Sequence, residues 1–337
     1  MKKIFNLIAS FVLLAGFSAC NKDGSDKPGL PPAPVPTVNY KGLTFISSGK
    51  STVCLAKVGA PDEITLEYST DESQWNPYTI GEKISMADGS FLLFRAGEQK
   101  NLTFSKGSDS YYHFEISGPV TAQGNIMSLL DRDFSTPLST NAFFALFEGC
   151  TSLLSAPELP ATTMEQGCYF RMFAECTGLK SAPELPAKEL AYNCYGWMFK
   201  GCSALTYVPD LPATEMVSYC YNNMFANCTN LKFAPELPAI RLDIGCYHCM
   251  FEGCTSLTSA PELPATELVS NCYEFMYKDC RNLRYVIGLF TTEPSEKTTK
   301  DWLSGVAASG TFIKSKKATW DVTSAHGVPE GWKIETW

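Results

Sequence analysis

Histidine and cysteine are the residue types of this 337-residue chain that most often serve as bases, nucleophiles or metal ligands, and the chain has 3 and 14 of them. His113, His248 and His326 lie far apart in the sequence, and no HExxH, GxSxG or glycine-rich phosphate loop accompanies them. An enzyme would need a constellation assembled from distant residues. We therefore expect no enzyme, no catalytic residue, no metal and no other cofactor.

Most of the cysteines form two series with a period of 26 residues. The first is Cys150, Cys176, Cys202, Cys228, Cys254 and Cys280, and the second is Cys168, Cys194, Cys220, Cys246 and Cys272. The two cysteines of one unit, such as Cys168 and Cys176, are eight residues apart. Zinc sites favour cysteine pairs that are closer in sequence, such as CxxC. Eight helical residues span about 12 Å, whereas the Cα atoms of a disulfide lie at most about 7 Å apart. Buried thiols are thus favoured over zinc or disulfides, although a broken helix would relax the distance argument. Cys249, at a variable position, is the best candidate for an exposed thiol.

The same period governs the apolar residues. A fixed period of this size is typical of stacked structural repeats. The pattern CYxxMFxxC has apolar residues at i, i+4 and i+5, which predicts a short helix with one buried face. A leucine then begins a short parallel strand, and a proline ends it because proline cannot donate into a ladder. The sequence predicts a mixed α/β fold, in which six 26-residue coils of one strand and one helix form a leucine-rich-repeat solenoid.

Other segments flank this solenoid. Between residues 38 and 122, short segments such as "EITLEYS" alternate apolar and polar residues and predict an antiparallel β-sandwich. The solenoid is expected over 123–285 and a C-terminal cap over 286–337. In the cap we expect a helix at "TTKDWLSGV", with Thr298 or Thr299 as its N-cap, and a strand at "GTFIK". We expect the C-terminal end of the solenoid to be covered by Trp320, Trp332 and Trp337.

The first residues predict export. Residues 1–19 combine two lysines with a short apolar run that ends in small residues before Cys20, which is typical of a lipoprotein signal peptide. Residues 20–37 are polar and then proline-rich, as in an extended tether. Cys20 is therefore the expected lipidation site, with an ordinary signal peptide as the alternative.

The chain resembles the BspA-like leucine-rich-repeat surface lipoproteins of Bacteroidetes. The resemblance comprises the lipidated start, the sandwich with "LEYSTDESQW", the connector "GNIMSLL", the coils and the tail "GVPEGW". It implies a cell-surface protein that binds host or matrix components, with no catalytic residues. The cysteines of the second series stand where the family coil has a bulky aliphatic residue.

Ligand contacts in stacked repeats usually come from positions that vary between units. One such column holds serine in three units and an aromatic residue in the others, beside a column with three cations. The candidate ligand-binding residues are Lys180, Tyr207, Lys232, Phe233, Arg284 and Tyr285. Scattered surface residues, or residues partly buried against neighbouring parts, are the alternative. A nearby acidic column, which invites cations or forms a solvated edge, is Glu158, Glu184, Asp210, Glu236 and Glu262.

The net charge of −8 and the lack of a basic patch argue against nucleic acid as a partner. The sequence thus predicts a non-enzymatic lipoprotein, anchored by its lipid in the outer membrane at the cell surface, that adheres to host or matrix protein. The alternative is a glycan-binding lipoprotein of a polysaccharide uptake system.

Overall fold

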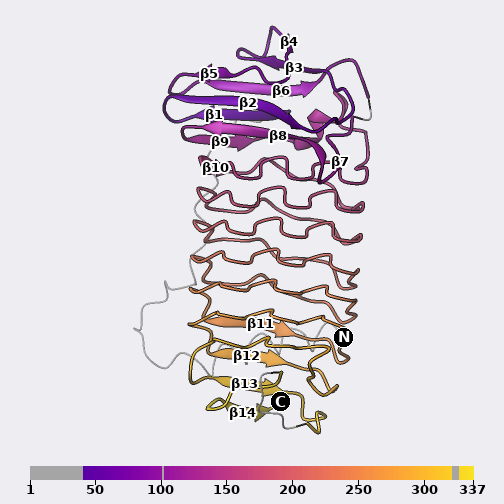
Figure 1. Ribbon diagram of the computed structural model, residues 1–337, viewed down its shortest axis with the longest axis vertical. Coiled ribbons are helices and arrows are strands. Elements are labelled where there is room, and N and C mark those ends of the chain that lie inside the picture. The colour runs from indigo at the N-terminus through magenta and orange to yellow at the C-terminus, as the bar shows by residue number, and fades with distance from the viewer. Residues whose placement is uncertain (1–40, 101, 321–325) are drawn as a thin grey trace, which may run out of the picture. The chain divides into compact units, whose positions relative to one another are not determined.

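The computed structural model describes residues 41–100, 102–320 and 326–337. These described residues form one compact unit (Figure 1). Its strands are β1 (Leu43–Ser47), β2 (Ser51–Val58), β3 (Leu66–Ser69), β4 (Asn76–Tyr78), β5 (Ile84–Met86), β6 (Phe91–Ala96), β7 (Ser105–Gly107), β8 (Ser110–Ser117), β9 (Val120–Gln123), β10 (Leu153–Ser155), β11 (Ser259–Leu263), β12 (Tyr285–Gly288), β13 (Thr311–Lys314) and β14 (Lys333–Thr336).

Two sheets pack face to face at the N-terminal end of this unit. One has the order β10-β9-β1-β6-β3-β4 and the other β5-β2-β8-β7. Strands β1 to β9 pair antiparallel, whereas β10, from the first repeat, pairs parallel with β9. Phe45 of β1 meets Phe114 of β8 edge-on across the interior, with ring centroids 5.0 Å apart. The first repeat therefore extends one of the two sheets.

The repeat units contain turns where helices were predicted. The expectation of a mixed α/β leucine-rich-repeat solenoid with one helix per coil is wrong, because the only helix in the described residues is the 3-10 helix η1 (Ile126–Leu129). In the first unit Asn141, Ala145 and Gly149 have φ values of 56°, 53° and 74°, and the same three positions are left-handed in most later units. An α-helix requires φ near −63° throughout. A left-handed residue at every fourth position thus prevents a helix.

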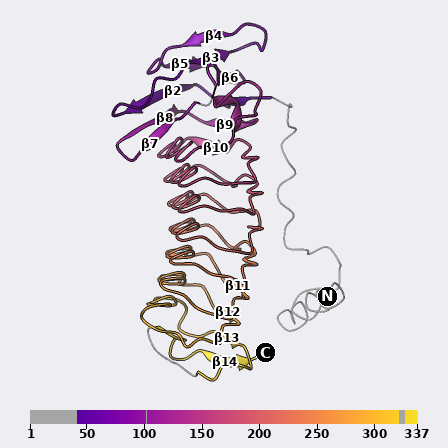
Figure 2. The same cartoon turned by 90° about the vertical axis from the view of Figure 1, so that its right-hand side faces the viewer.

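The backbone hydrogen bonds of this segment alternate between two directions. The N–H of Phe143 donates to the carbonyl of Cys168 in the next unit, at 2.8 Å. The next N–H, that of Phe144, donates to Asn141 three residues back, at 3.1 Å. The alternation continues along the segment and recurs in later units, whose turns lie one above another (Figure 2). Half of these donors therefore join neighbouring units.

Aromatic side chains form two buried columns through the units. Rings of one column lie 5.3–5.7 Å apart, and its members are Phe147, Phe173, Phe199, Phe225 and Phe251. Rings of the other lie 5.7–6.0 Å apart, and its members are Tyr169, Tyr195, Tyr221, Tyr247 and Tyr273. Phe114 of β8 stacks on Phe147 at 5.2 Å. One hydrophobic core thus runs from the two sheets into the repeats.

The first cysteine series completes the hydrogen bonding of this core. The thiol of Cys176 donates to the carbonyl of Phe147 in the preceding unit, at 3.0 Å. The same carbonyl accepts the N–H of Cys150, also at 3.0 Å. A carbonyl oxygen has two lone pairs, and here both are used. Each later cysteine of the series bonds the equivalent carbonyl 29 residues back, at 3.0–3.1 Å.

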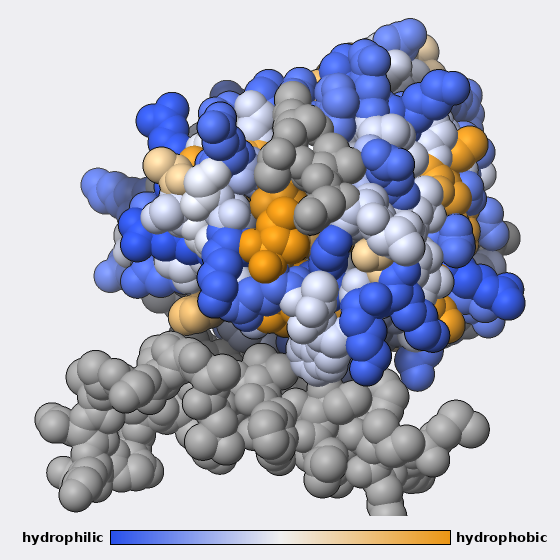
Figure 3. Space-filling model, turned by 90° about the horizontal axis from the view of Figure 1, so that it is seen from below, coloured by the Kyte–Doolittle hydropathy of each residue, from blue (hydrophilic) through white to orange (hydrophobic). Residues whose placement is uncertain are grey.

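The opposite side of each unit is extended but forms few regular strands. Parallel bridges such as Ser181 to Tyr207 join some of the middle units, and a continuous parallel sheet, β11-β12-β13-β14, appears only toward the C-terminus. The helix expected at "TTKDWLSGV" is wrong, because residues 296–305 form turns and bends. Seen from that end, the surface is mostly hydrophilic with separate apolar patches (Figure 3).

Tryptophans pack into this last part of the chain. Trp302 is fully buried, stacks on Tyr273 with ring centroids 6.1 Å apart, and donates its indole N–H to Gly327 at 2.7 Å. Trp320 and Trp332 are also buried, whereas Trp337 is 43% exposed. The aromatic column of tyrosines therefore ends on the larger indole of Trp302.

Candidate functional site

The six candidate ligand-binding residues lie in two adjacent columns on the extended side of the units, which we call the strand face. In the first column Ser181 pairs with Tyr207, and Ser259 of β11 pairs with Tyr285 of β12. In the second column the N–H of Thr206 donates to the carbonyl of Lys180 at 3.0 Å. Equivalent positions of different units are thus brought side by side.

The exposure of these residues differs. Tyr207 and Phe233, in consecutive units, are 37% and 61% exposed, while the leucine that begins each extended segment is buried. Lys180, Lys232 and Arg284 are exposed, and Tyr285 is half-buried. The structure therefore presents two neighbouring rings and three cations to solvent, with Tyr285 less accessible.

The acidic column runs beside the aromatic residues. Burial and then the nearby charges of Glu184 and Asp210 raise the pKa of the Tyr207 hydroxyl. Burial and then repulsion from Glu236 raise the pKa of Glu262. The N–H of Glu236 donates to the side chain of Asp210 at 3.2 Å. In the described ranges no three histidine, cysteine or acidic side chains form a group able to hold a metal ion.

All thirteen cysteines in the described part of the chain are unpaired and buried. The expectation that Cys249 is exposed is wrong: it is 6% exposed, and its sulfur lies 3.7 Å from Nε2 of His248. Burial raises the pKa of the Cys202 thiol well above its usual range and raises that of Cys194 to about 12. Neutral, inaccessible thiols are poor nucleophiles.

We expect iodoacetamide to leave these thirteen cysteines unmodified in the native protein at pH 8. After unfolding in urea without reductant, all thirteen should react, because none is in a disulfide. Mass spectrometry of peptides counts the modified sites. Fast native modification of Cys249, or continued protection in urea, would contradict the structure.

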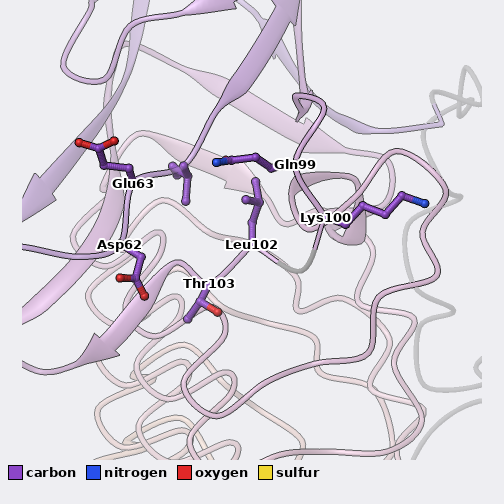
Figure 4. Close-up of a pocket in the computed structure, with 7 residues that line it drawn as sticks. Asp62, Glu63, Gln99, Lys100, Leu102 and Thr103 are labelled. Carbon is purple, nitrogen blue, oxygen red and sulfur yellow. The ribbon is translucent and has the colours of Figure 1, made fainter.

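A hollow of about 280 Å³ lies in the sandwich (Figure 4). It is lined by Asp62, Glu63, Ile64, Gln99, Lys100, Leu102 and Thr103. Asp62 already pairs with Lys106 at 2.7 Å, Lys100 pairs with Asp133 at 3.1 Å, and Gln99 accepts the backbone N–H of Thr65. Asp62, Lys100 and Gln99 are thus already bound to residues outside the lining of the hollow, and the strand face is the stronger candidate.

The sequence reading missed the outward side of the turns, which we call the turn face. It consists of the half-buried side chains at the x positions of CYxxMFx, whereas other x positions, such as Asn223 and Cys249, are buried. These positions carry the half-buried aromatics Phe170, Trp197 and Phe275, together with Lys200 and Lys278. Variation was the available signal, because "CYFRMFA", "CYGWMFK" and "CYEFMYK" differ mainly at x.

No family model, no curated protein and no solved structure matches this chain. In the described parts, no helix has the length and apolar character needed to cross a membrane. Cys20, the expected lipidation site, lies outside the described residues.

Proposed function

We propose that this chain is a non-enzymatic, lipid-anchored protein of the outer membrane that adheres to host or matrix protein through its strand face. The observation that carries the proposal is the exposure of Tyr207 and Phe233 in consecutive units. Aromatic side chains are enriched among the residues that dominate protein–protein binding.

The framework around these rings supports a binding role. The stacking of the units relies on buried columns of phenylalanine, tyrosine and cysteine, which are constant or nearly so. The residues at 207 and 233 are serine in three other units and are not required for stacking. Exposed rings flanked by Lys180 and Lys232 offer both apolar contact and charge to a partner.

We expect the triple change Tyr207→Ser, Phe233→Ser and Tyr285→Ser to weaken binding to an array of purified extracellular-matrix proteins. Each lost aromatic anchor removes about 1–2 kcal/mol of binding free energy. The melting temperature should change little for Tyr207 and Phe233, and somewhat more for the half-buried Tyr285.

The control is Tyr192→Ser, which removes a ring that is 47% exposed and lies outside the strand face. It should leave array binding unchanged. Loss of the fold in the triple variant would show that the column is part of the core. Unchanged binding by a folded triple variant would exclude the strand face as the site of adhesion.

A further inference from the structure

We propose that the turn face binds an acidic polysaccharide, independently of the strand face, through two clusters that each combine an aromatic ring with two cations. The clusters occupy equivalent positions, because Phe275 follows Trp197 by 78 residues, which is three units of 26.

The first cluster is centred on Trp197. The ammonium group of Lys200 lies 3.8 Å from the centroid of the indole ring, and the guanidinium group of Arg171 lies 5.8 Å from it. The indole N–H donates to the side-chain oxygen of Asn222 at 2.9 Å, which fixes the ring. Arg171 also pairs with Glu148, so one of the two cations is already neutralised.

The second cluster is centred on Phe275. The ammonium groups of Lys278 and Lys300 lie 5.1 and 5.7 Å from its ring centroid. Lys278 stands three residues after Phe275, as Lys200 does after Trp197. It pairs with Glu252 at 3.4 Å. Each cluster thus has one cation from its own unit, one from a neighbouring unit, and one carboxylate.

One cation in each cluster has no carboxylate partner in the described part of the chain. Among the residues that the structure describes, neither Lys200 nor Lys300 forms an ion pair. A cation beside an aromatic ring is held in place without losing its charge. Both clusters can therefore offer a positive charge to a ligand next to a half-buried ring.

An acidic polysaccharide matches this arrangement better than a small anion. The apolar face of a sugar ring can contact Trp197 or Phe275, while a carboxylate or sulfate group meets Lys200 or Lys300. Three units of about 4.8 Å separate the clusters by about 14 Å, so an extended ligand is needed to reach both. The net charge of −8 opposes a polyanion at long range, so the contacts act at short range and are screened by salt.

Surface plasmon resonance on the full-length protein, with heparin and polygalacturonate as probes, tests the proposal. Lys200→Gln and Lys300→Gln should each weaken binding about threefold, and the double change about tenfold. A heparin disaccharide, too short to reach both clusters, should bind more weakly than the polymer and lose little further affinity in either single variant. Raising the salt concentration should weaken the binding of both polymers.

The matched control is Lys180→Gln with Lys232→Gln, which removes the same charge from the strand face and should leave polysaccharide binding intact. Equal losses in the control and the Lys200/Lys300 pair would overturn the proposal. So would equal binding of neutral dextran, or equal binding of polyglutamate, which has charge without sugar rings. Matrix-protein binding in the Lys200/Lys300 variant reports on the strand face separately.

Discussion

Replacing Phe225 by alanine is expected to destabilise the folded chain by about 3–5 kcal/mol, as for other buried phenylalanines. Phe225 is fully buried, and its ring stacks between those of Phe199 and Phe251, with both centroid distances 5.7 Å. The change removes the ring and leaves a cavity in a column whose neighbours are held by backbone bonds on both sides. Urea unfolding followed by circular dichroism measures the loss.

Phe233→Ala is the matched control, because it removes the same ring from the same unit. Phe233 is 61% exposed, so this change should alter stability by less than about 0.5 kcal/mol. If the two variants unfolded at the same urea concentration, the stacked column would not be the source of stability.

The second large effect is expected at Asp131, a fully buried carboxylate after η1. It accepts the N–H groups of Asp133 at 2.7 Å, Ser135 at 3.2 Å and Thr136. These bonds hold the loop that leads from the sandwich into the first unit. Asp131→Ala would leave the three donors without this acceptor and should cost about 3 kcal/mol of stability. Thermal unfolding at pH 7 checks this value.

The pH dependence at Asp131 has a definite sign. Burial raises its pKa, but the hydrogen bonds from Thr136, Ser135 and Asp133 lower it more, so the folded pKa lies below the ordinary value. The stabilisation is present above the unfolded pKa of about 3.9 and is lost as the pH falls through the folded pKa. The wild type should therefore lose stability below about pH 4 more steeply than the Asp131→Ala variant. Asp133→Ala, which removes only an exposed ion pair, should change the stability at pH 7 by less than about 0.5 kcal/mol.

The 26-residue period was visible in the sequence, but the conformation within each period was not. Apolar residues at i, i+4 and i+5 fit a helix, and the same spacing also suits consecutive turns whose inner side chains stack on equivalent residues. The distinction depends on where the backbone N–H groups donate, and half of them donate to another unit. The spacing of apolar residues within one unit does not show that a backbone N–H donates to a carbonyl 25 residues away.

One signal against a helix was nevertheless present. The position before the first-series cysteine is occupied by Gly149, Glu175, Gly201, Asn227, Gly253 and Asp279. Glycine, asparagine and aspartate are the residues that most readily adopt a left-handed conformation. All six have positive φ. Read down the column, this composition favours a repeated left-handed turn over a helix.

The candidate site was only partly accessible to sequence reasoning. The columns of Tyr207 and Lys180 could be aligned by period alone, but the burial of Tyr285 and Cys249 depends on neighbouring units. The turn face was missed because Arg171, Trp197 and Lys200 come from two units and meet only in the folded stack. These three side chains lie close together only because neighbouring units pack against each other.

The alternation of hydrogen bonds makes every junction between units nearly interchangeable. The carbonyl shared by Cys150 and Cys176 is repeated at each later junction, so a whole unit of 26 residues could be duplicated or excised with the remaining ladders in register. Loss of a single residue would instead shift every ladder downstream. Recombination between such similar segments would therefore lengthen or shorten the stack by whole units. It would also change the distance between Trp197 and Phe275.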